Sequence, residues 1–302
     1  MRISLVLGSG GARGYAHIGA IEELLSRGHE IVAVAGSSIG ALVGGAYAAG
    51  RLDDLKQTAL KLTRADLWMM AQPSLNTPGL LKLDRVMKRM EQVVGDVRIE
   101  ELPMPYTAVA TDLLAGREIW FHSGPLLTAI RASIAIPSVF QPIMLHGRLL
   151  VDGGVVNPLP METSLRLDAD LTVAVSLFGR ERGWEHGSAI EISSDESSSN
   201  PLNRLQERLA DVLPTARARA VRSAPTDPFE PLPPDLDLTD MLTMSLDVMH
   251  ERIQASRVAV NPPDVHVEVP ARTSTLFDFD QAARIIEIGR QLAAEQFDEA
   301  GL

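Results

Sequence analysis

A serine bounded by glycines follows an apolar run near the start of the chain. Residues 31–35 read IVAVA and residues 36–40 read GSSIG, so Ser38 stands between Gly36 and Gly40. A strand that turns sharply into a helix needs glycine beside the turn, because the residue at the turn is strained and the helix begins next to it. The pattern predicts a nucleophilic hydroxyl above a sheet, near a helix N-terminus that favours negative charge. The alternative for so short a pattern is an ordinary strand-to-helix turn.

A second glycine cluster follows the first apolar run of the chain. Residues 5–7, LVL, lead into GSGGARG at 8–14. Consecutive glycines at a helix start let backbone N–H groups approach an anion, so this loop is an oxyanion hole if it faces Ser38. The competing interpretation is a loop that binds nucleotide phosphates. It is disfavoured because Arg13 replaces the last glycine of the dinucleotide fingerprint and because Glu30 precedes the second strand instead of ending it.

Asp152 is the candidate proton acceptor for this serine. It follows an apolar stretch and precedes Gly153 and Gly154, a position where an aspartate commonly caps its own turn. A Ser-Asp-His order would have to use His250 or His266. We expect His250 on the solvent side of a helix and His266 on the outward side of a strand, so neither is placed for catalysis.

Together these motifs resemble the patatin-like phospholipase family, and specifically its small bacterial members similar to the catalytic domain of neuropathy target esterase. The segments that carry the resemblance are GGARG at 10–14, GSSIG at 36–40, ASIAIP at 132–137 and DGG at 152–154. The resemblance implies a three-layer α/β/α fold with a mostly parallel central sheet. It also implies a Ser38–Asp152 dyad that works without histidine. The implied oxyanion hole uses the amides of Gly10 and Gly11, with Ala12 as a further donor.

The activity that the resemblance implies is hydrolysis of fatty-acyl esters of lipids, with lysophospholipids as the leading candidates and without a metal or organic cofactor. Ser38 would attack the acyl carbonyl while Asp152 accepts its proton. One departure from the family is Ser9, which replaces the first of three consecutive glycines that members often carry. We interpret Arg13 as a brace for the glycine loop in preference to a phosphate-binding charge. The alternative function is an acyl-ligand-binding or regulatory protein on the same fold with little turnover.

Composition restricts the partners of the chain. A net charge of −11 argues against nucleic acid and against a general attraction to anionic bilayers, so we expect lipid contact only at the membrane periphery. The absence of cysteine from the sequence excludes a thiol nucleophile. The first apolar run is too short for a signal peptide, and no run is long enough to span a membrane. These features predict a cytoplasmic protein.

The order of elements predicts one hydrolase domain over residues 1–302. Apolar runs predict strands at 3–7, 31–35, 106–110 and 171–177, with shorter antiparallel strands at 118–121 and 148–151. Helices are predicted at 14–26, 38–49, 84–94 with Asp84 as N-cap, 125–133, 239–258 and 278–298, with a late strand at 264–270. In the helix at 239–258 we expect an apolar core stripe of Leu242, Leu246, Met249 and Ile253.

A change in composition predicts a variable, mobile insertion at about 180–235. A serine-rich tract covers residues 193–199, and five prolines lie between Ala224 and Pro234. Between them, residues 202–221 are predicted to form an arginine-rich helix. It is interpreted as a solvated surface helix, with a lid or a phospholipid contact as the alternative.

Overall fold

The computed structural model describes residues 1–70, 72–73, 81–137, 139–164, 168–179 and 238–302. Contacts divide the chain into two units. The first comprises Met1–Glu181 with Leu242–Leu302, and the second comprises Arg182–Met241, of which only the last four residues are described. The predicted insertion at about 180–235 and its helix lie outside the described residues.

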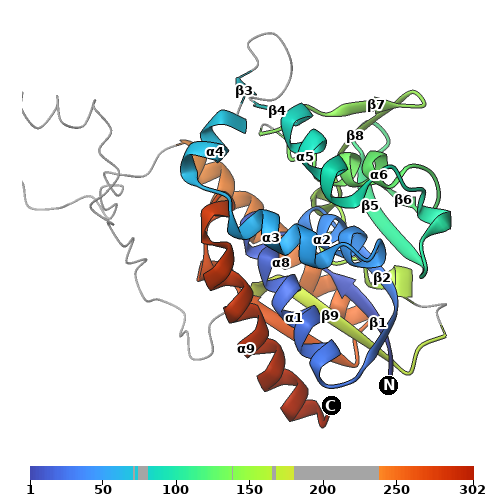
Figure 1. Ribbon diagram of the computed structural model, residues 1–302. Coiled ribbons are helices and arrows are strands. Elements are labelled where there is room, and N and C mark those ends of the chain that lie inside the picture. Colours follow the sequence, from blue (N-terminus) through green and yellow to red (C-terminus); the bar gives the residue numbers. More distant parts are fainter. Residues whose placement is uncertain (71, 74–80, 138, 165–167, 180–237) are drawn as a thin grey trace, which may run out of the picture. The chain divides into compact units, whose positions relative to one another are not determined.

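The described residues contain an eight-stranded sheet with the order β10-β9-β1-β2-β5-β8-β7, and β6 pairs with β5 (Figure 1). Strands β10, β9, β1, β2 and β5 run parallel, whereas β6, β7 and β8 are antiparallel additions. The strands are β1 (Arg2–Leu7), β2 (Glu30–Ser37), β5 (Tyr106–Asp112), β6 (Arg117–Phe121), β7 (Ile143–Leu145), β8 (Arg148–Asp152), β9 (Leu171–Gly179) and β10 (Val265–Pro270). A separate ladder pairs β3 (Gln72–Pro73) with β4 (Leu81–Lys82). The predicted, mostly parallel sheet is confirmed.

The helices follow the predicted order with small shifts at their ends. They are α1 (Tyr15–Ser26), α2 (Ile39–Ala48), α3 (Leu52–Leu60), α4 (Arg64–Met70), α5 (Asp84–Val94), α6 (Leu126–Ser133), α8 (Leu238–Val260) and α9 (Ala282–Ala300). The sequence motifs did not predict α3 and α4. Asp84 is the first residue of α5 and not its N-cap; Leu83 takes the cap position without a side-chain hydrogen bond. The prediction of Asp84 as N-cap was therefore wrong by one residue.

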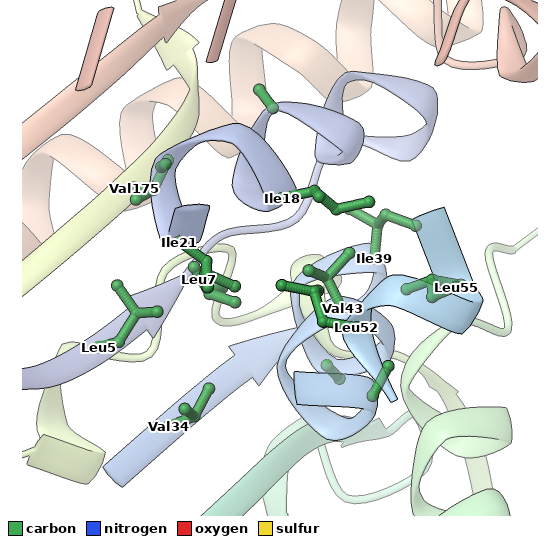
Figure 2. Close-up of a cluster of buried hydrophobic side chains, with 14 of the residues drawn as sticks. Leu5, Leu7, Ile18, Ile21, Val34, Ile39, Val43, Leu52, Leu55 and Val175 are labelled. Atoms are coloured by element: carbon green, nitrogen blue, oxygen red, sulfur yellow. The ribbon is translucent and has the colours of Figure 1, made fainter. Parts of the chain in front are cut away.

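The alternation of side chains along β1 places helices on both faces of the sheet. Ile3, Leu5 and Leu7 join the large core with α1, α2 and α9, whereas Val6 points to the other face, where Val258 of α8 packs near it. Figure 2 shows part of the large core, where side chains from β1, α1 and α2 meet. The three-layer α/β/α arrangement is thus the direct result of strands that are apolar on both faces.

Helices α1 and α9 pack side by side through two glycines (Figure 1). A Cβ atom at Gly19 of α1 would collide with the carbonyl of Ile286, and one at Gly289 of α9 would collide with the backbone of Ala16. This close approach fixes α1 directly behind the glycine loop that precedes it.

Helix α8 matches the predicted apolar core stripe only in part, because Leu246 and Ile253 are half-buried whereas Met249 faces solvent. Met249, expected in the core, is 54% exposed, whereas Gln254 is only 4% exposed. The groups that face the body of the protein include Asp247 and Arg257, which form ion pairs there. The prediction of an apolar core stripe fails at Met249 because this helix docks onto charged partners, and periodicity of apolar residues does not reveal such partners. Among the described residues, no helix is long and apolar enough to cross a bilayer.

Candidate active site

Ser38 occupies a strained turn between β2 and α2. Its backbone angles are φ 55° and ψ −125°, a conformation that non-glycine residues rarely adopt. A Cβ atom at Gly36 would collide with the Gly40 carbonyl, and a Cβ atom at Gly40 would collide with the carbonyl of Leu7. Both glycines of the GSSIG pattern are therefore required for close packing, and Ser38 stands directly at the N-terminus of α2.

Asp152 lies at the end of β8 and contacts this serine. Ser38 Oγ donates a hydrogen bond to Asp152 Oδ2 across 2.5 Å. The other carboxylate oxygen accepts a 2.7 Å hydrogen bond from the Gly154 amide, so Asp152 also caps its own turn. Both side chains belong to residues that are 4% exposed. The sequence suggested two roles for Asp152, a cap of its own turn and a partner of Ser38. One side-chain geometry is compatible with both roles.

The glycine loop contains two backbone conformations that favour glycine. Gly10 has φ 155° and Gly11 has φ 59°. Within the described part of the chain, the amides of Gly10 and Gly11 donate to no acceptor, and Gly11 lies in the wall of the same cavity as Ser38. Ala12 differs, because its amide donates a 3.0 Å hydrogen bond to the Leu276 carbonyl. The expectation that Ala12 is a further oxyanion donor therefore conflicts with a bond that already engages its N–H.

A family model places these three features in one known group of proteins. The model of the patatin-like phospholipases matches residues 5–165, which include the glycine loop, Ser38 and Asp152. The chain belongs to the patatin-like phospholipase family. It is 39% identical to uncharacterised NTE family proteins of Mycobacterium bovis and Mycobacterium tuberculosis, over 98% of this chain and 91% of theirs. It is 32% identical to the neuropathy target esterase sws of Drosophila melanogaster, over 59% of this chain and 13% of that protein.

Family membership confirms the resemblance drawn from the motifs and the patatin fold. It also implies lipid acyl hydrolase activity and lipid substrates for this chain. Among the described residues, no group of three or more acidic or histidine side chains is placed to hold a metal ion.

Burial controls the charge of Asp152 in this patatin-like site. Burial raises its pKa to about 7, and the hydrogen bonds from Ser38 and Gly154 lower the pKa in part. A carboxylate with such a pKa is a stronger base than an exposed aspartate, whose pKa is about 3.9. The site therefore holds a carboxylate that gains and loses its proton near neutral pH.

We expect kcat/KM for a non-ionisable ester to rise with pH and to reach half its plateau near pH 7. In a Ser38–Asp152 dyad only the ionised carboxylate, whose pKa burial raises to about 7, would accept the Ser38 proton. Steady-state rates between about pH 5 and pH 9 measure this profile. A profile that is flat over this range would show that the rate does not depend on a carboxyl group with a raised pKa.

Arg13 holds the glycine loop against neighbouring elements. Its guanidinium contacts the carbonyls of Leu177 and Ala271 at 3.4 and 3.3 Å, and it binds both oxygens of Asp247 at 3.0 Å. It also lies 5.1 Å from the centre of the Phe178 ring. With the residue 1% exposed, its charge is engaged inside the protein. This geometry favours the interpretation of Arg13 as a brace.

His17 is a second support of the glycine loop that the sequence motifs did not predict. Its Nε2 lies 2.8 Å from the Gly8 carbonyl. Burial lowers the pKa of His17 to about 4, so the ring is neutral and Nε2 donates its hydrogen to that carbonyl. The only sequence signal for this role is its place two residues into α1, directly behind the loop.

A cluster of charged side chains supports the segment after Asp152. Arg257 of α8 binds Glu162 at 2.6 Å, Glu118 at 2.7 Å and the Val156 carbonyl at 3.1 Å. Asn157 donates a 2.8 Å hydrogen bond to Glu118, which ties this segment to the same cluster. Helix α8 is thus bonded both to the glycine loop, through Asp247, and to the segment that follows the candidate base.

His250 and His266 have no hydrogen bond to Ser38 or Asp152 in the described structure. The His250 ring packs 5.0 Å from that of Phe178, and burial with the nearby Arg13 charge lowers its pKa to about 4. His266 Nε2 lies 2.9 Å from Ser176 Oγ. Both residues are half-buried, so their predicted solvent-facing positions were wrong, because α8 and β10 each bury the face that carries them.

An apolar cavity of about 500 Å³ opens beside Ser38. Its walls come from the glycine loop with the start of α1, from α2, α3, α4 and α5, from the segment after α6 and from the segment before α9. The apolar lining side chains are Tyr15, Ile39, Leu42, Leu55, Ala59, Leu62, Leu67, Leu83, Val86, Met90, Ile134, Ile136, Phe140, Phe277 and Phe279. The lining segments are far apart in the sequence, which is why the motifs alone did not predict this cavity.

Proposed function

We propose that this chain hydrolyses fatty-acyl esters of lipids through the Ser38–Asp152 dyad, as a lysophospholipase or a related esterase. The observation that carries the proposal is the 2.5 Å hydrogen bond to Asp152 Oδ2 from Ser38 Oγ, and Ser38 lies in the wall of an apolar cavity. A nucleophile within hydrogen-bond reach of its base is the geometry that such catalysis requires.

The proposed reaction has two halves. Ser38 Oγ forms a bond to the acyl carbonyl carbon and its proton passes to Asp152, while the amides of Gly10 and Gly11 stabilise the oxyanion. The ester C–O bond then breaks, and Asp152 returns the proton to the leaving alcohol. A water molecule next loses a proton to Asp152, attacks the acyl-enzyme and releases the fatty acid, after which the proton returns to Ser38 Oγ.

The cavity supports an acyl chain as the group that is bound next to the nucleophile. Its volume of about 500 Å³ falls within the usual range for small-molecule pockets, and most of its lining side chains are apolar. A single chain that enters this cavity places its ester carbonyl at the wall that contains Ser38. This favours substrates with one acyl chain, such as lysophospholipids.

Turnover of a homologous series of acyl esters tests this proposal. We expect kcat/KM to rise with chain length from a butanoyl ester until the cavity is full, by at most about fourfold per methylene, because each buried CH₂ contributes about 0.8 kcal/mol. A panel of short esters, lysophospholipids and diacyl phospholipids measures both chain-length and head-group preference. Activity limited to short esters would remove the lipid part of the proposal.

Leu62→Trp should reduce kcat/KM for a hexadecanoyl ester by about tenfold or more relative to the butanoyl ester, since the larger side chain occupies room for several methylenes. Leu62 lines the cavity and is half-buried. The matched control is Leu60→Trp, two residues away, because Leu60 is exposed and does not line the cavity. An equal effect of both substitutions on the long ester would show that the chain binds elsewhere.

A further inference from the structure

The hydroxyl of Ser133 joins two main-chain groups at the end of α6. It accepts a 2.8 Å hydrogen bond from the amide of Ser38 and donates a 2.6 Å hydrogen bond to the carbonyl of Val109 on β5. Ser133 is fully buried. One side-chain oxygen therefore connects the strained turn of the candidate nucleophile to the middle of the sheet.

Ala135, two residues further along, bonds to the other half of the dyad. Its carbonyl accepts a 2.9 Å hydrogen bond from the amide of Asp152. The carbonyl of Asp152 in turn accepts a 2.9 Å hydrogen bond from the hydroxyl of Thr111 on β5. The segment 133–135 thus bonds to the backbone of both Ser38 and Asp152.

The sheet order explains why such a connection matters. Strand β5 lies between β2 and β8, so the two dyad residues come from strands that do not pair with each other. Ser37 pairs with Val109 and Asp152 pairs with Ala110, so the C-terminal ends of β2 and β8 pair with adjacent residues of β5. The distance between Ser38 Oγ and Asp152 Oδ2 consequently depends on β5 and on the bonds made by segment 133–135.

We propose that Ser133 is a positioning residue that sets the spacing of the Ser38–Asp152 dyad by holding the Ser38 amide. This inference rests on the proposed function, because Ser133 acts only through the dyad. Strain at a turn such as that of Ser38 persists only where the surroundings hold it. Among the described residues, the Ser133 hydroxyl is the side-chain group with a hydrogen bond to the backbone of Ser38.

Loss of this hydroxyl leaves two buried main-chain groups without their partner, the Ser38 amide and the Val109 carbonyl. The turn is then free to relax, and Ser38 Oγ moves away from Asp152 Oδ2. Proton transfer needs the two atoms within hydrogen-bond reach, at most about 3.2 Å apart, and a displacement of about 1 Å can cost about 100-fold in rate. The acyl cavity keeps its walls, because Ser133 does not line it.

Steady-state kinetics of Ser133→Ala with a short ester test the proposal. We expect kcat to fall by about 10- to 100-fold while KM stays within about threefold. The acid limb of the pH profile should move to higher pH, because a weaker Ser38 hydrogen bond no longer lowers the pKa of Asp152. The kcat of Ser133→Cys should lie between that of wild type and that of Ser133→Ala, since sulfur accepts and donates hydrogen bonds only weakly.

Ser176→Ala is the matched control. Ser176 is equally buried and bonds to the His266 ring, but it lies on β9, which is separated from β2 by β1. It should lose stability without any change in kcat or in the pH limb. A Ser133→Ala protein with kcat within about twofold of wild type and an unmoved limb would overturn the inference. If that variant does not fold, wild-type kcat in Ser133→Cys would overturn it instead. Full activity of Ser38→Ala would refute the proposed function itself, which is a separate outcome.

Discussion

Replacing Ser38 with alanine is expected to reduce ester turnover by a factor of about 10⁴–10⁶ and to abolish covalent labelling by an alkyl fluorophosphonate. The reason is that Ser38 Oγ is the hydroxyl bonded to the buried Asp152 carboxylate, and the variant keeps the cavity but has no atom to attack the carbonyl. Turnover of a short ester and intact-protein mass after labelling measure the two effects.

Ser37→Ala is the sharpest control for this substitution. Ser37 is the neighbouring serine of the same motif and is fully buried, yet its hydroxyl has no hydrogen-bond partner among the described residues. It should therefore keep both labelling and turnover. Equal labelling of wild type and Ser38→Ala, or loss of labelling in Ser37→Ala alone, would contradict the assignment of the nucleophile. A protein that binds acyl ligands without turnover would remain unlabelled in all three forms.

The sequence predicted the features that depend on local chemistry. Apolar runs predicted β1, β2, β5 and β9 correctly, because a strand that is buried on both faces is a continuous run of apolar residues. The turn at Ser38 was predictable since a Cβ atom at Gly36 or Gly40 would collide with the backbone. The dyad partner Asp152 was found through its glycine-bounded position and the family resemblance, and it remains a proposal that the variants test.

The sequence did not predict features that arise when distant segments meet. Ala12 lies next to Gly11 in the same glycine loop, but the amide of Ala12 donates to the carbonyl of Leu276, which is distant in the sequence. The polar inner face of α8 has a partner in Arg13, which precedes Asp247 by 234 positions, so no local periodicity could reveal it. The same holds for the apolar cavity beside Ser38, whose walls come from segments far apart in the sequence. Tertiary contacts, and not local propensity, decide these features.

Asp152→Asn is expected to reduce kcat by about 10³–10⁴. The Gly154 amide donates to Oδ1 and fixes the orientation of the side chain. The Asn amide nitrogen then faces Ser38 Oγ and donates a hydrogen where the carboxylate accepted one. Ser38 consequently keeps a neighbour of the same shape but loses its proton acceptor. Single-turnover rates with a short ester measure this loss.

Asp112→Asn serves as the control for the removal of a buried aspartate. Asp112 is also buried, and its side chain accepts a 3.2 Å hydrogen bond from the Ala115 amide in a turn. Turnover should remain near the wild-type value in this variant. His250→Ala and His266→Ala should also retain most activity, because neither ring bonds to the dyad. An inactive histidine variant beside an active Asp152→Asn would restore a mechanism that uses histidine as the base.

Asp152→Asn is also expected to stabilise the folded protein at alkaline pH. Burial raises the folded-state pKa of Asp152 to about 7, above the unfolded value near 3.8, so this group favours folding below about pH 4 and loses that contribution as the pH rises through 7. At pH 8 the buried negative charge reduces the free energy of unfolding by about 2–4 kcal/mol, and asparagine removes this charge. Thermal unfolding should therefore show a higher Tm for Asp152→Asn at pH 8, with a difference that narrows toward pH 5. A lower Tm at both pH values would mean that the carboxylate is not held against a desolvation penalty. Its basicity would then need another source. If burial is what makes Asp152 basic, Asp152→Asn should lower activity and raise stability. The same desolvation that raises the pKa of the carboxylate also opposes folding.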